Sequence, residues 1–390
     1  MMDGQERPVI GFDATAALTQ GGGIGRYTRE LIHALVDEAP NFSYKLFSAR
    51  PPAVMPVDNP LPHRANVINR PAPFEEHWLY RIWYRLRLPL PVQAFTGPID
   101  LFHSPDFVLP PVRGHIPTIL TVHDLSFVHY PTTFPSRLVD YLNRVVPWSV
   151  SRAGHVLADS SSTRRDLQEI WRVPSDKITV LYSGVNERFK PVTDPYELEA
   201  VRARHKLSAP YVLAVGTVQP RKNYEFLVRA FRLVAERHPH QLIIAGGKGW
   251  LDEDLPLEIV RQGLQDRVRL AGFVDDADLP ALYTMAELLV FPSLYEGFGL
   301  PLLEAMACGT PVISSNASSL PEVAQGDSAI LLPPDDESAW TAAMLDLISD
   351  VDLRSRLAAA GYRQSAQFSW RAAARQLAAL YDELLKSSTY

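Results

Sequence analysis

The sequence holds a single cysteine, Cys308, and lacks any long uninterrupted hydrophobic run. One cysteine excludes an internal disulfide and suits a reducing cytoplasm. No stretch approaches the ~18 apolar residues that a membrane-spanning helix needs. The first residues, MMDGQERPVI, carry two acids and lack the apolar core of a signal peptide. We therefore expect a cytoplasmic protein.

An excess of positive charge is also missing. The formal net charge is −6 over 390 residues, so no overall field attracts nucleic acid, and we expect no nucleic-acid partner. Any anionic ligand must meet a local cluster of Arg, Lys or backbone N–H groups. No pair of His or Cys stands at a familiar metal-ligand spacing, so no metal site is expected. The length favours two or three domains.

Short β-branched runs alternate with helical patterns, which is typical of parallel α/β units. Each half opens with a strand and a polar or glycine-rich turn, followed by an amphipathic helix. The two helices are expected at 25–40 and 223–238. This order predicts an α/β fold of two doubly wound, Rossmann-like domains. Strands are expected at 8–13, 44–49, 100–104, 118–124 and 155–160, and then at 211–217, 241–247, 268–274, 288–293, 310–315 and 329–334.

The domain boundaries follow from the composition between the two sets of strands. Residues 181–199 are rich in turn formers and are the expected linker. We therefore expect an N-terminal domain over 1–184 and a C-terminal domain over 185–368. A last amphipathic helix, within 369–390, is expected to join the first domain.

Two glutamates, Glu296 and Glu304, flank a glycine turn in FPSLYEGFGLPLLEAMACGTPVISS (291–315). Gly297 and Gly299 permit backbone angles that direct N–H groups at a helix start toward an anion or a hydroxyl. Glu304 is expected in the first turn of that helix, where the dipole favours a carboxylate. A carboxylate there also accepts two hydrogen bonds from a vicinal diol such as ribose. A lone glutamate is more often a surface residue, but the pair favours a ligand site.

Two adjacent cations, Arg221 and Lys222, follow a predicted strand in GTVQPRKN (216–223). An isolated basic pair is usually a solvated turn. At the carboxyl end of a parallel strand, a forked Arg and a point-charge Lys favour the binding of a diphosphate.

Three other motifs have two or more interpretations each. GGGIGRY (21–27) lacks the full G-x-G-x-x-G fingerprint and its downstream acid, so it is either a tight turn or a loop against a phosphate or an acceptor. His123, at a strand end, is a structural residue, a metal ligand or an acid–base group, and the structural role is the usual one. The acids in 275–278 resemble a metal motif but favour an N-cap for the next helix.

The segment HWLYRIWYRLRLPLP (77–91) concentrates aromatic and basic residues. Such a helix can lie on an anionic membrane, in which case the protein is peripheral at the inner face. Packing on the first domain with the arginines reaching water is the alternative.

The run EGFGLPLLEAMACGTPVISS, followed by SSLPEVAQGDSAILLPPDD, resembles the E-x7-E signature of retaining glycosyltransferase family 4. That family has the GT-B fold, with two Rossmann-like domains facing a central cleft. The likeness is continuous over 291–336, and GGGIGRY, FHSPDF, TVHDLSFVHYP, LYSGVNERF, VGTVQPRKN and LAGFV extend it over nearly the whole chain. HDLSFVHYP and PRKN most resemble mannosyltransferase-like members that build bacterial polysaccharides.

The resemblance implies a retaining, metal-independent transfer of mannose from GDP-mannose to a hydroxyl of a glycan or polyprenol-linked saccharide, without a cofactor. It places the acceptor in the first domain and the donor in the second. It assigns Glu296 to the sugar hydroxyls, Arg221 and Lys222 to the diphosphate, and His123 to a polar contact near the donor sugar. The implied donor-binding residues are Gly23, Gly25, Gly216, Phe273, Val274, Gly297, Phe298, Gly299, Leu300 and, for the ribose, Glu304.

Three alternatives stay open at this point. A UDP-sugar-dependent, glucosyl-type transferase has the same fold, and a base held by backbone contacts leaves no side-chain signature that separates GDP from UDP. A nicotinamide-dependent oxidoreductase is disfavoured by the incomplete glycine fingerprint. A non-catalytic sugar-nucleotide-binding protein is disfavoured because both glutamates and both cations are present.

Overall fold

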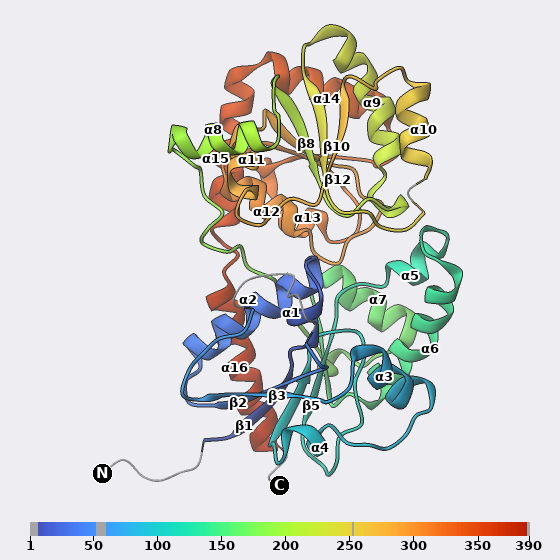
Figure 1. Ribbon diagram of the computed structural model, residues 1–390, viewed down its shortest axis with the longest axis vertical. Coiled ribbons are helices and arrows are strands. Elements are labelled where there is room, and N and C mark those ends of the chain that lie inside the picture. Colours follow the sequence, from blue (N-terminus) through green and yellow to red (C-terminus); the bar gives the residue numbers. More distant parts are fainter. Residues whose placement is uncertain (1–6, 52–59, 252, 388–390) are drawn as a thin grey trace. The chain divides into compact units, whose positions relative to one another are not determined.

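The computed structural model describes residues 7–51, 60–251 and 253–387 (Figure 1). The chain forms two compact units. The first comprises 1–125, 140–184 and 370–390, and the second comprises 126–139 and 185–369. The expected boundaries differ from this division at 126–139, because aromatic rings of that segment pack within the second unit.

The first unit is built on a seven-stranded parallel sheet in the order β3-β2-β1-β4-β5-β6-β7. The strands are β1 (Val9–Asp13), β2 (Ser43–Ser48), β3 (Val67–Pro71), β4 (Leu101–Ser104), β5 (Thr118–Val122), β6 (His155–Ala158) and β7 (Ile178–Val180). Every residue of β4, β5 and β6 is buried. This continuous burial is what a parallel sheet covered on both faces requires.

Helices surround this sheet (Figure 1). They are α1 (Thr15–Thr19), α2 (Gly23–Glu38), α3 (Glu76–Tyr80), the π-helical segment η1 (Arg81–Arg85), α4 (Gln93–Thr96), α6 (Ser136–Arg152), which begins in the 126–139 segment, α7 (Ser161–Trp171), the short η3 (Ser175–Lys177) and α16 (Trp370–Ser387). The C-terminal helix α16 packs beside α2. The last helix therefore completes the first unit.

The second unit holds a six-stranded parallel sheet in the order β10-β9-β8-β11-β12-β13. Its strands are β8 (Tyr211–Val215), β9 (Gln241–Ala245), β10 (Val268–Gly272), β11 (Leu288–Phe291), β12 (Val312–Ser315) and β13 (Ile330–Leu332). Its helices are α5 (Ser126–His129), η2 (Pro131–Thr133), α8 (Pro195–Arg204), η4 (Pro220–Lys222), α9 (Tyr224–Arg237), α10 (Asp254–Arg261), α11 (Leu279–Met285), α12 (Leu300–Ala307), α13 (Leu320–Val323), η5 (Gly326–Ser328), α14 (Glu337–Ser349) and α15 (Val351–Ser365).

Two apolar clusters cover the two faces of this second sheet. Leu213 and Val215 of β8 point into one cluster, whereas Val212 and Ala214 point into the other. Successive side chains of a strand alternate between faces, so the sheet is buried on both sides.

The predicted fold of two doubly wound units is confirmed, and two strands were missed. β3 is an edge strand whose last four residues are exposed, so it lacks the apolar run that predicts a strand. β7 has the β-branched residues typical of a strand, but its three residues fall short of the about four that such a run needs. The acidic run does supply the N-cap residue of the next helix, but without a capping hydrogen bond. Asp278 precedes α11, but its carboxylate makes no cap bond and accepts hydrogen bonds from Arg204 and His205 instead.

The strand orders define one switch point in each unit. In the first unit the order reverses between β1 and β4, and in the second between β8 and β11. Ligands of open parallel sheets bind beyond the carboxyl ends of the strands at this point. A ligand site is therefore expected at each of the two switch points.

The 77–91 segment forms α3 and η1 and packs on the first unit. The Trp83 ring is 2% exposed and lies 5.6 Å from the Phe47 ring, whereas Arg81, Arg85 and Arg87 are exposed.

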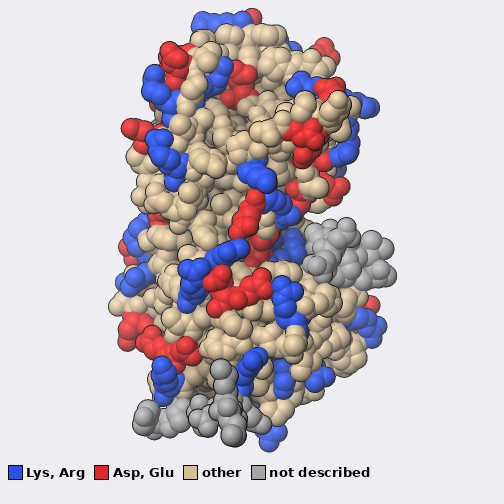
Figure 2. All heavy atoms as spheres, turned by 90° about the vertical axis from the view of Figure 1, so that its left-hand side faces the viewer, with Lys and Arg blue, Asp and Glu red and all other residues tan. Residues whose placement is uncertain are grey.

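No helix in the described part of the chain is both long and apolar enough to cross a bilayer. On the face drawn in Figure 2, Lys and Arg side chains are interspersed with Asp and Glu.

The helix α16 is tied to the first sheet by a buried hydrogen bond. Tyr381 is fully buried, and its hydroxyl lies 2.8 Å from Nδ1 of His103 on β4. Burial lowers the pKa of His103 to about 3, so the ring is neutral.

The Tyr381→Phe variant leaves Nδ1 of His103 without a partner, and we expect it to lower the free energy of unfolding by about 1–3 kcal/mol in urea titrations. Tyr362→Phe, at a half-exposed position on α15, is the control, and equal losses in both variants would contradict the role of the bond.

Candidate active site

The loops at the switch point of the second unit meet through one carboxylate. Glu296 follows β11, and its Oε1 lies 2.6 Å from Nζ of Lys222. Its Oε2 lies 3.0 Å from Nη1 of Arg221. Both cations belong to η4, directly after β8, and each of the three residues is at least nine-tenths buried. Two cations and one anion leave this cluster with a net charge of +1.

Local backbone geometry places the two cations. Asn223 has a left-handed φ of +60°, a conformation that asparagine tolerates, and this turns the chain from η4 into α9. Its side-chain amide donates to the carbonyl of Pro334 at 2.8 Å. Gly216 gives Lys222 room, because a Cβ there would lie 3.2 Å from the lysine Cε. The Gly216 position is thus explained by close packing, and its contact with a donor stays a prediction.

The Glu296 loop is fixed by two serines from the turn that leads into α13. The hydroxyl of Ser319 donates to the carbonyls of Glu296 and Phe298, both at 2.9 Å. The backbone N–H of Glu296 donates to Oγ of Ser318 at 2.7 Å. These bonds hold the carboxylate toward the two cations without help from a ligand.

The charge state of Glu296 follows from its partners. Burial alone raises the pKa of this carboxyl, but the adjacent charges of Arg221 and Lys222 outweigh burial and lower the pKa to about 2. Glu296 is therefore ionised at neutral pH and has no proton to donate.

The second glutamate, Glu304, does not lie in the first turn of its helix. It is the fifth residue of α12 and is 2% exposed, so the expectation of a dipole-favoured first-turn position is wrong. Its Oε2 accepts a hydrogen bond from the Tyr283 hydroxyl at 2.9 Å. A ribose at Glu304 would have to share or replace this bond, and that contact stays a prediction.

The other residues predicted for the donor fall into two groups within the second unit. Gly297, Phe298, Gly299 and Leu300 form the turn into α12, where Gly299 has a φ of +116° that favours glycine. Phe273 and Val274 follow β10: the Phe273 side chain is 62% exposed, whereas Val274 packs in the core. Donor contact at these positions stays a prediction.

The glycines of GGGIGRY lie at the start of α2 in the first unit. Gly23 is the first helical residue and is exposed. Gly25 is buried, and a Cβ there would lie 1.9 Å from the carbonyl oxygen of Gln20. Gly25 is therefore needed for the close approach of α1 and α2, and the donor contact of both glycines stays a prediction.

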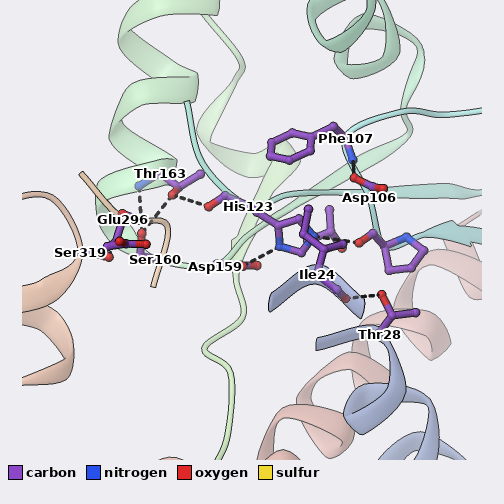
Figure 3. A network of polar contacts seen from close by, with 12 residues as sticks. Ile24, Thr28, Asp106, Phe107, His123, Asp159, Ser160, Thr163, Glu296 and Ser319 are labelled. Carbon is purple, nitrogen blue, oxygen red and sulfur yellow. Dashed lines mark hydrogen bonds and ion pairs between the residues drawn. The ribbon is translucent and has the colours of Figure 1, made fainter. Parts of the chain in front are cut away.

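His123 follows β5 in the first unit and is buried, and Figure 3 shows its polar contacts. Nδ1 lies 2.7 Å from Oδ2 of Asp159, and Nε2 lies 2.9 Å from the carbonyl of Pro105. Burial lowers the pKa of His123, but the Asp159 charge and hydrogen bond more than reverse this and raise it to about 9. The ring is thus an imidazolium that donates both N–H groups and is unsuited as a general base. Its contact with the donor stays a prediction.

Sequence reasoning missed the support that 126–139 gives to the Glu296 loop. The His129 ring stacks on the Tyr295 ring at 5.1 Å between centroids. Nearby, Nε1 of Trp250 donates to the carbonyl of Thr133 at 2.8 Å. Tyr295 directly precedes Glu296, and its carbonyl accepts a hydrogen bond from Arg221. In the sequence, the motif HYP was the only sign of this segment. Contacts between rings more than a hundred residues apart leave no local sequence pattern.

The fold is shared with a solved structure over its full length. Sucrose-phosphate synthase from Thermosynechococcus elongatus superimposes with a TM-score of 0.76 at 23% identity, over 98% of this chain and 100% of that one. This likeness shows the GT-B fold, the class of two Rossmann-like units seen in glycosyltransferases.

Sequence comparisons give the family. Residues 21–189 match the model described as Glycosyltransferase Family 4, and residues 197–364 match the model described as Glycosyl transferases group 1. O-antigen chain mannosyltransferase B of Escherichia coli is 33% identical over 359 residues, which cover 89% of this chain and 92% of the relative. O-antigen chain mannosyltransferase RfbU of Salmonella typhimurium is 30% identical and covers 72% of each chain. The chain therefore belongs to glycosyltransferase family 4.

The pairing of Glu296 predicts a specific pH dependence of stability. The pKa of Glu296 is about 2 in the folded protein against an ordinary value of 4.5, so its contribution is fully present above pH 4.5 and is lost as the pH falls toward 2. We expect the difference in free energy of unfolding between wild type and Glu296→Gln to shrink by roughly 1–2 kcal/mol from pH 7 to pH 3.5. Urea titrations at both pH values measure it.

The control for this experiment is Glu199→Gln, at an exposed position on α8 of the same unit. Its difference from wild type should stay constant across the two pH values. A Glu296→Gln difference that is equally constant would show that the carboxylate is not held by the two cations.

Proposed function

We propose that the protein transfers mannose from GDP-mannose to a hydroxyl of a glycan or a lipid-linked saccharide, with retention of the anomeric configuration. The observation that carries this proposal is the buried cluster of Arg221, Lys222 and Glu296 at the switch point of the second unit. The choice of mannose is supported by the likeness to two O-antigen chain mannosyltransferases at 33% and 30% identity.

The cluster suits the diphosphate of a nucleotide sugar. Its net charge of +1 is buried, where the attraction for an anion is stronger than in water. Arg221 offers a planar donor fork and Lys222 a compact charge, the two modes by which proteins hold phosphates. As the bond to the sugar breaks, charge develops on the diphosphate, and these prepositioned cations stabilise it. This chemistry needs no metal ion.

Glu296 suits hydrogen bonding to the donor sugar better than covalent catalysis. The carboxylate stays ionised at neutral pH and accepts hydrogen bonds from sugar hydroxyls. Both of its oxygens are held by cations, which lowers its reactivity toward an anomeric carbon. Retention then follows from same-face attack, in which the acceptor oxygen bonds to the anomeric carbon and a donor phosphate oxygen takes its proton.

The donor is tested first by thermal unfolding with GDP, UDP, ADP, dTDP and NADH, without added metal. A ligand at about 100 times its Kd adds about 2.7 kcal/mol of stability, which is a readable shift in Tm. We expect GDP to give the largest shift in Tm. In a separate transfer assay, we expect mannose to pass from GDP-mannose to a saccharide with an unchanged anomeric configuration in the product. A shift with UDP alone would replace the donor, and one with NADH alone would overturn the proposal.

Variants separate binding from transfer. Lys222→Ala should lose both the GDP shift and transfer, because the buried site then lacks half of its positive charge. Lys386→Ala, at an exposed position on α16, is the matched control and should behave like wild type. Transfer by Lys222→Ala at the wild-type rate would refute the assigned role.

We also infer that the outer face of α3 and η1 rests on an anionic membrane. Trp78 is 48% exposed and Leu86 is 63% exposed, and Arg81, Arg85 and Arg87 are exposed beside them. Apolar side chains next to exposed arginines are the pattern of an interfacial helix, and a lipid-linked acceptor would place the enzyme at such a surface.

Sedimentation with vesicles tests this surface. We expect wild type to sediment with phosphatidylglycerol vesicles at low salt, less so with phosphatidylcholine vesicles, and the Trp78→Ala/Leu86→Ser double variant to lose most of this binding. Leu257→Ser, at a 55% exposed position in the second unit, controls for the loss of a surface leucine. Equal sedimentation of the double variant and wild type would place membrane contact elsewhere.

A further inference from the structure

A buried tyrosine of the second unit is bonded to one of the two glutamates predicted for the donor. Tyr283 lies in α11 and is fully buried. Its hydroxyl donates to Oε2 of Glu304 in α12 at 2.9 Å. The two helices pack against each other, so the bond joins neighbouring elements of the unit. The proposed transfer reaction has so far given this tyrosine no role.

The bond fixes one oxygen of a buried but flexible side chain. Glu304 is the fifth residue of α12 and is 2% exposed. The last torsion of a glutamate has no sharp preference, so hydrogen bonds set the plane of its carboxylate. A carboxylate offers about four lone-pair sites, and one tyrosine hydroxyl uses a single one of them. Tyr283 therefore sets the orientation of the carboxylate without using all of its acceptor capacity.

Tyr283 is itself held by three separate parts of the second unit. Oγ1 of Thr310, in the turn between α12 and β12, donates to the carbonyl of Tyr283 at 2.6 Å. The hydroxyl of Tyr211 on β8 donates to the carbonyl of Leu282 at 2.7 Å. The ring of Phe189, which precedes α8, lies 6.1 Å from the Tyr283 ring in an edge-on arrangement. A donor anchored at its backbone and at its ring holds its acceptor in one place.

We propose that Tyr283 is a positioning residue for the ribose of the donor: it orients the Glu304 carboxylate so that the two vicinal ribose hydroxyls can both donate to it. This inference rests on the proposed transfer reaction and on ribose binding at Glu304. Tyr283 does not touch the nucleotide and acts only through the glutamate. A carboxylate that is oriented before the ligand arrives loses less conformational entropy on binding, which raises the affinity.

The fixed carboxylate also selects the class of donor. A free carboxylate turns to follow whatever hydroxyls a ligand presents, whereas a held one matches a single geometry. The diol of a ribonucleoside diphosphate fits two oxygens in a fixed plane. A 2′-deoxyribonucleotide, the class to which dTDP belongs, offers one hydroxyl and leaves part of the carboxylate without its intended partner. Tyr283 therefore favours ribonucleotide donors over deoxyribonucleotide donors.

The preference for ribose over deoxyribose tests this role. Isothermal titration calorimetry on the full chain gives the Kd of GDP and of 2′-deoxy-GDP. We expect wild type to bind GDP about tenfold more tightly, the effect of one hydrogen bond to a charged group. In Tyr283→Phe this ratio of Kd values should fall by about threefold, because GDP binds more weakly and 2′-deoxy-GDP hardly changes. The phenylalanine keeps the ring and so keeps the packing.

Tyr211→Phe is the matched control. It removes another buried tyrosine hydroxyl, whose hydrogen bond also ends on α11, at the carbonyl of Leu282. A tyrosine with a purely structural role affects folding stability alone, so both variants should unfold at lower urea concentrations. Only Tyr283→Phe should lose the preference for ribose. Equal ratios in Tyr283→Phe and wild type would refute the positioning role, and a higher ratio would show that the tyrosine competes with the ribose.

A double variant shows whether Tyr283 acts through Glu304. The Glu304→Gln variant should lose most of the preference for ribose, and adding Tyr283→Phe should lower it no further. A further loss in the double variant would contradict an action through the carboxylate.

The wild-type result separates this inference from the proposed function. If wild type binds GDP and 2′-deoxy-GDP equally well, ribose binding at Glu304 and the role of Tyr283 are both refuted, and the GDP donor stands. If wild type binds UDP instead of GDP, the donor is replaced, and the ratio for UDP and 2′-deoxy-UDP decides the role of Tyr283 by the same criteria. Binding of no nucleotide would refute both proposals.

Discussion

The carboxylate of Glu296, held at once by Arg221 and Lys222, joins the two loops that flank the switch point of the second unit. Charges removed from water are costly unless they are paired, so each member of the cluster fixes the other two. The turn at Asn223 and the hydroxyl of Ser319 hold the backbone on either side. The positive character of the site is therefore built into the fold before any ligand arrives.

The two switch points differ in the ionisable side chains that they bring together. The loops after β8 and β11 combine two cations with one anion, whereas those after β1 and β4 bring Asp13 and Asp106 together with no lining cation. A net charge of −6 attracts no particular ligand, so local clusters must do so. On our proposal, the cluster of Arg221, Lys222 and Glu296 attracts the anionic donor.

His123 and Glu304 show that residues expected to touch a ligand already have protein partners. Asp159 and the carbonyl of Pro105 hold the His123 ring, and Tyr283 holds the Glu304 carboxylate. A hydrogen bond to a ligand is worth little net energy if an internal one is lost. Such a side chain therefore contributes most to ligand binding when it keeps its internal hydrogen bond and forms a second one to the ligand. A carboxylate with several lone pairs can do this.

The sequence by itself determined eleven of the thirteen strands in the described part of the chain, the doubly wound class, the cations after β8 and the glutamate after β11, because burial and turn chemistry leave local patterns. It missed β3, whose last four residues are exposed, and the three-residue β7, and it placed Glu304 in the wrong turn of α12. Only the tertiary structure decided that Glu296 pairs with Lys222, 74 residues away, and that Asp13, Asp106 and Tyr84 share one pocket. Such contacts depend on strand order, which brings distant segments to one sheet edge and which no local period encodes.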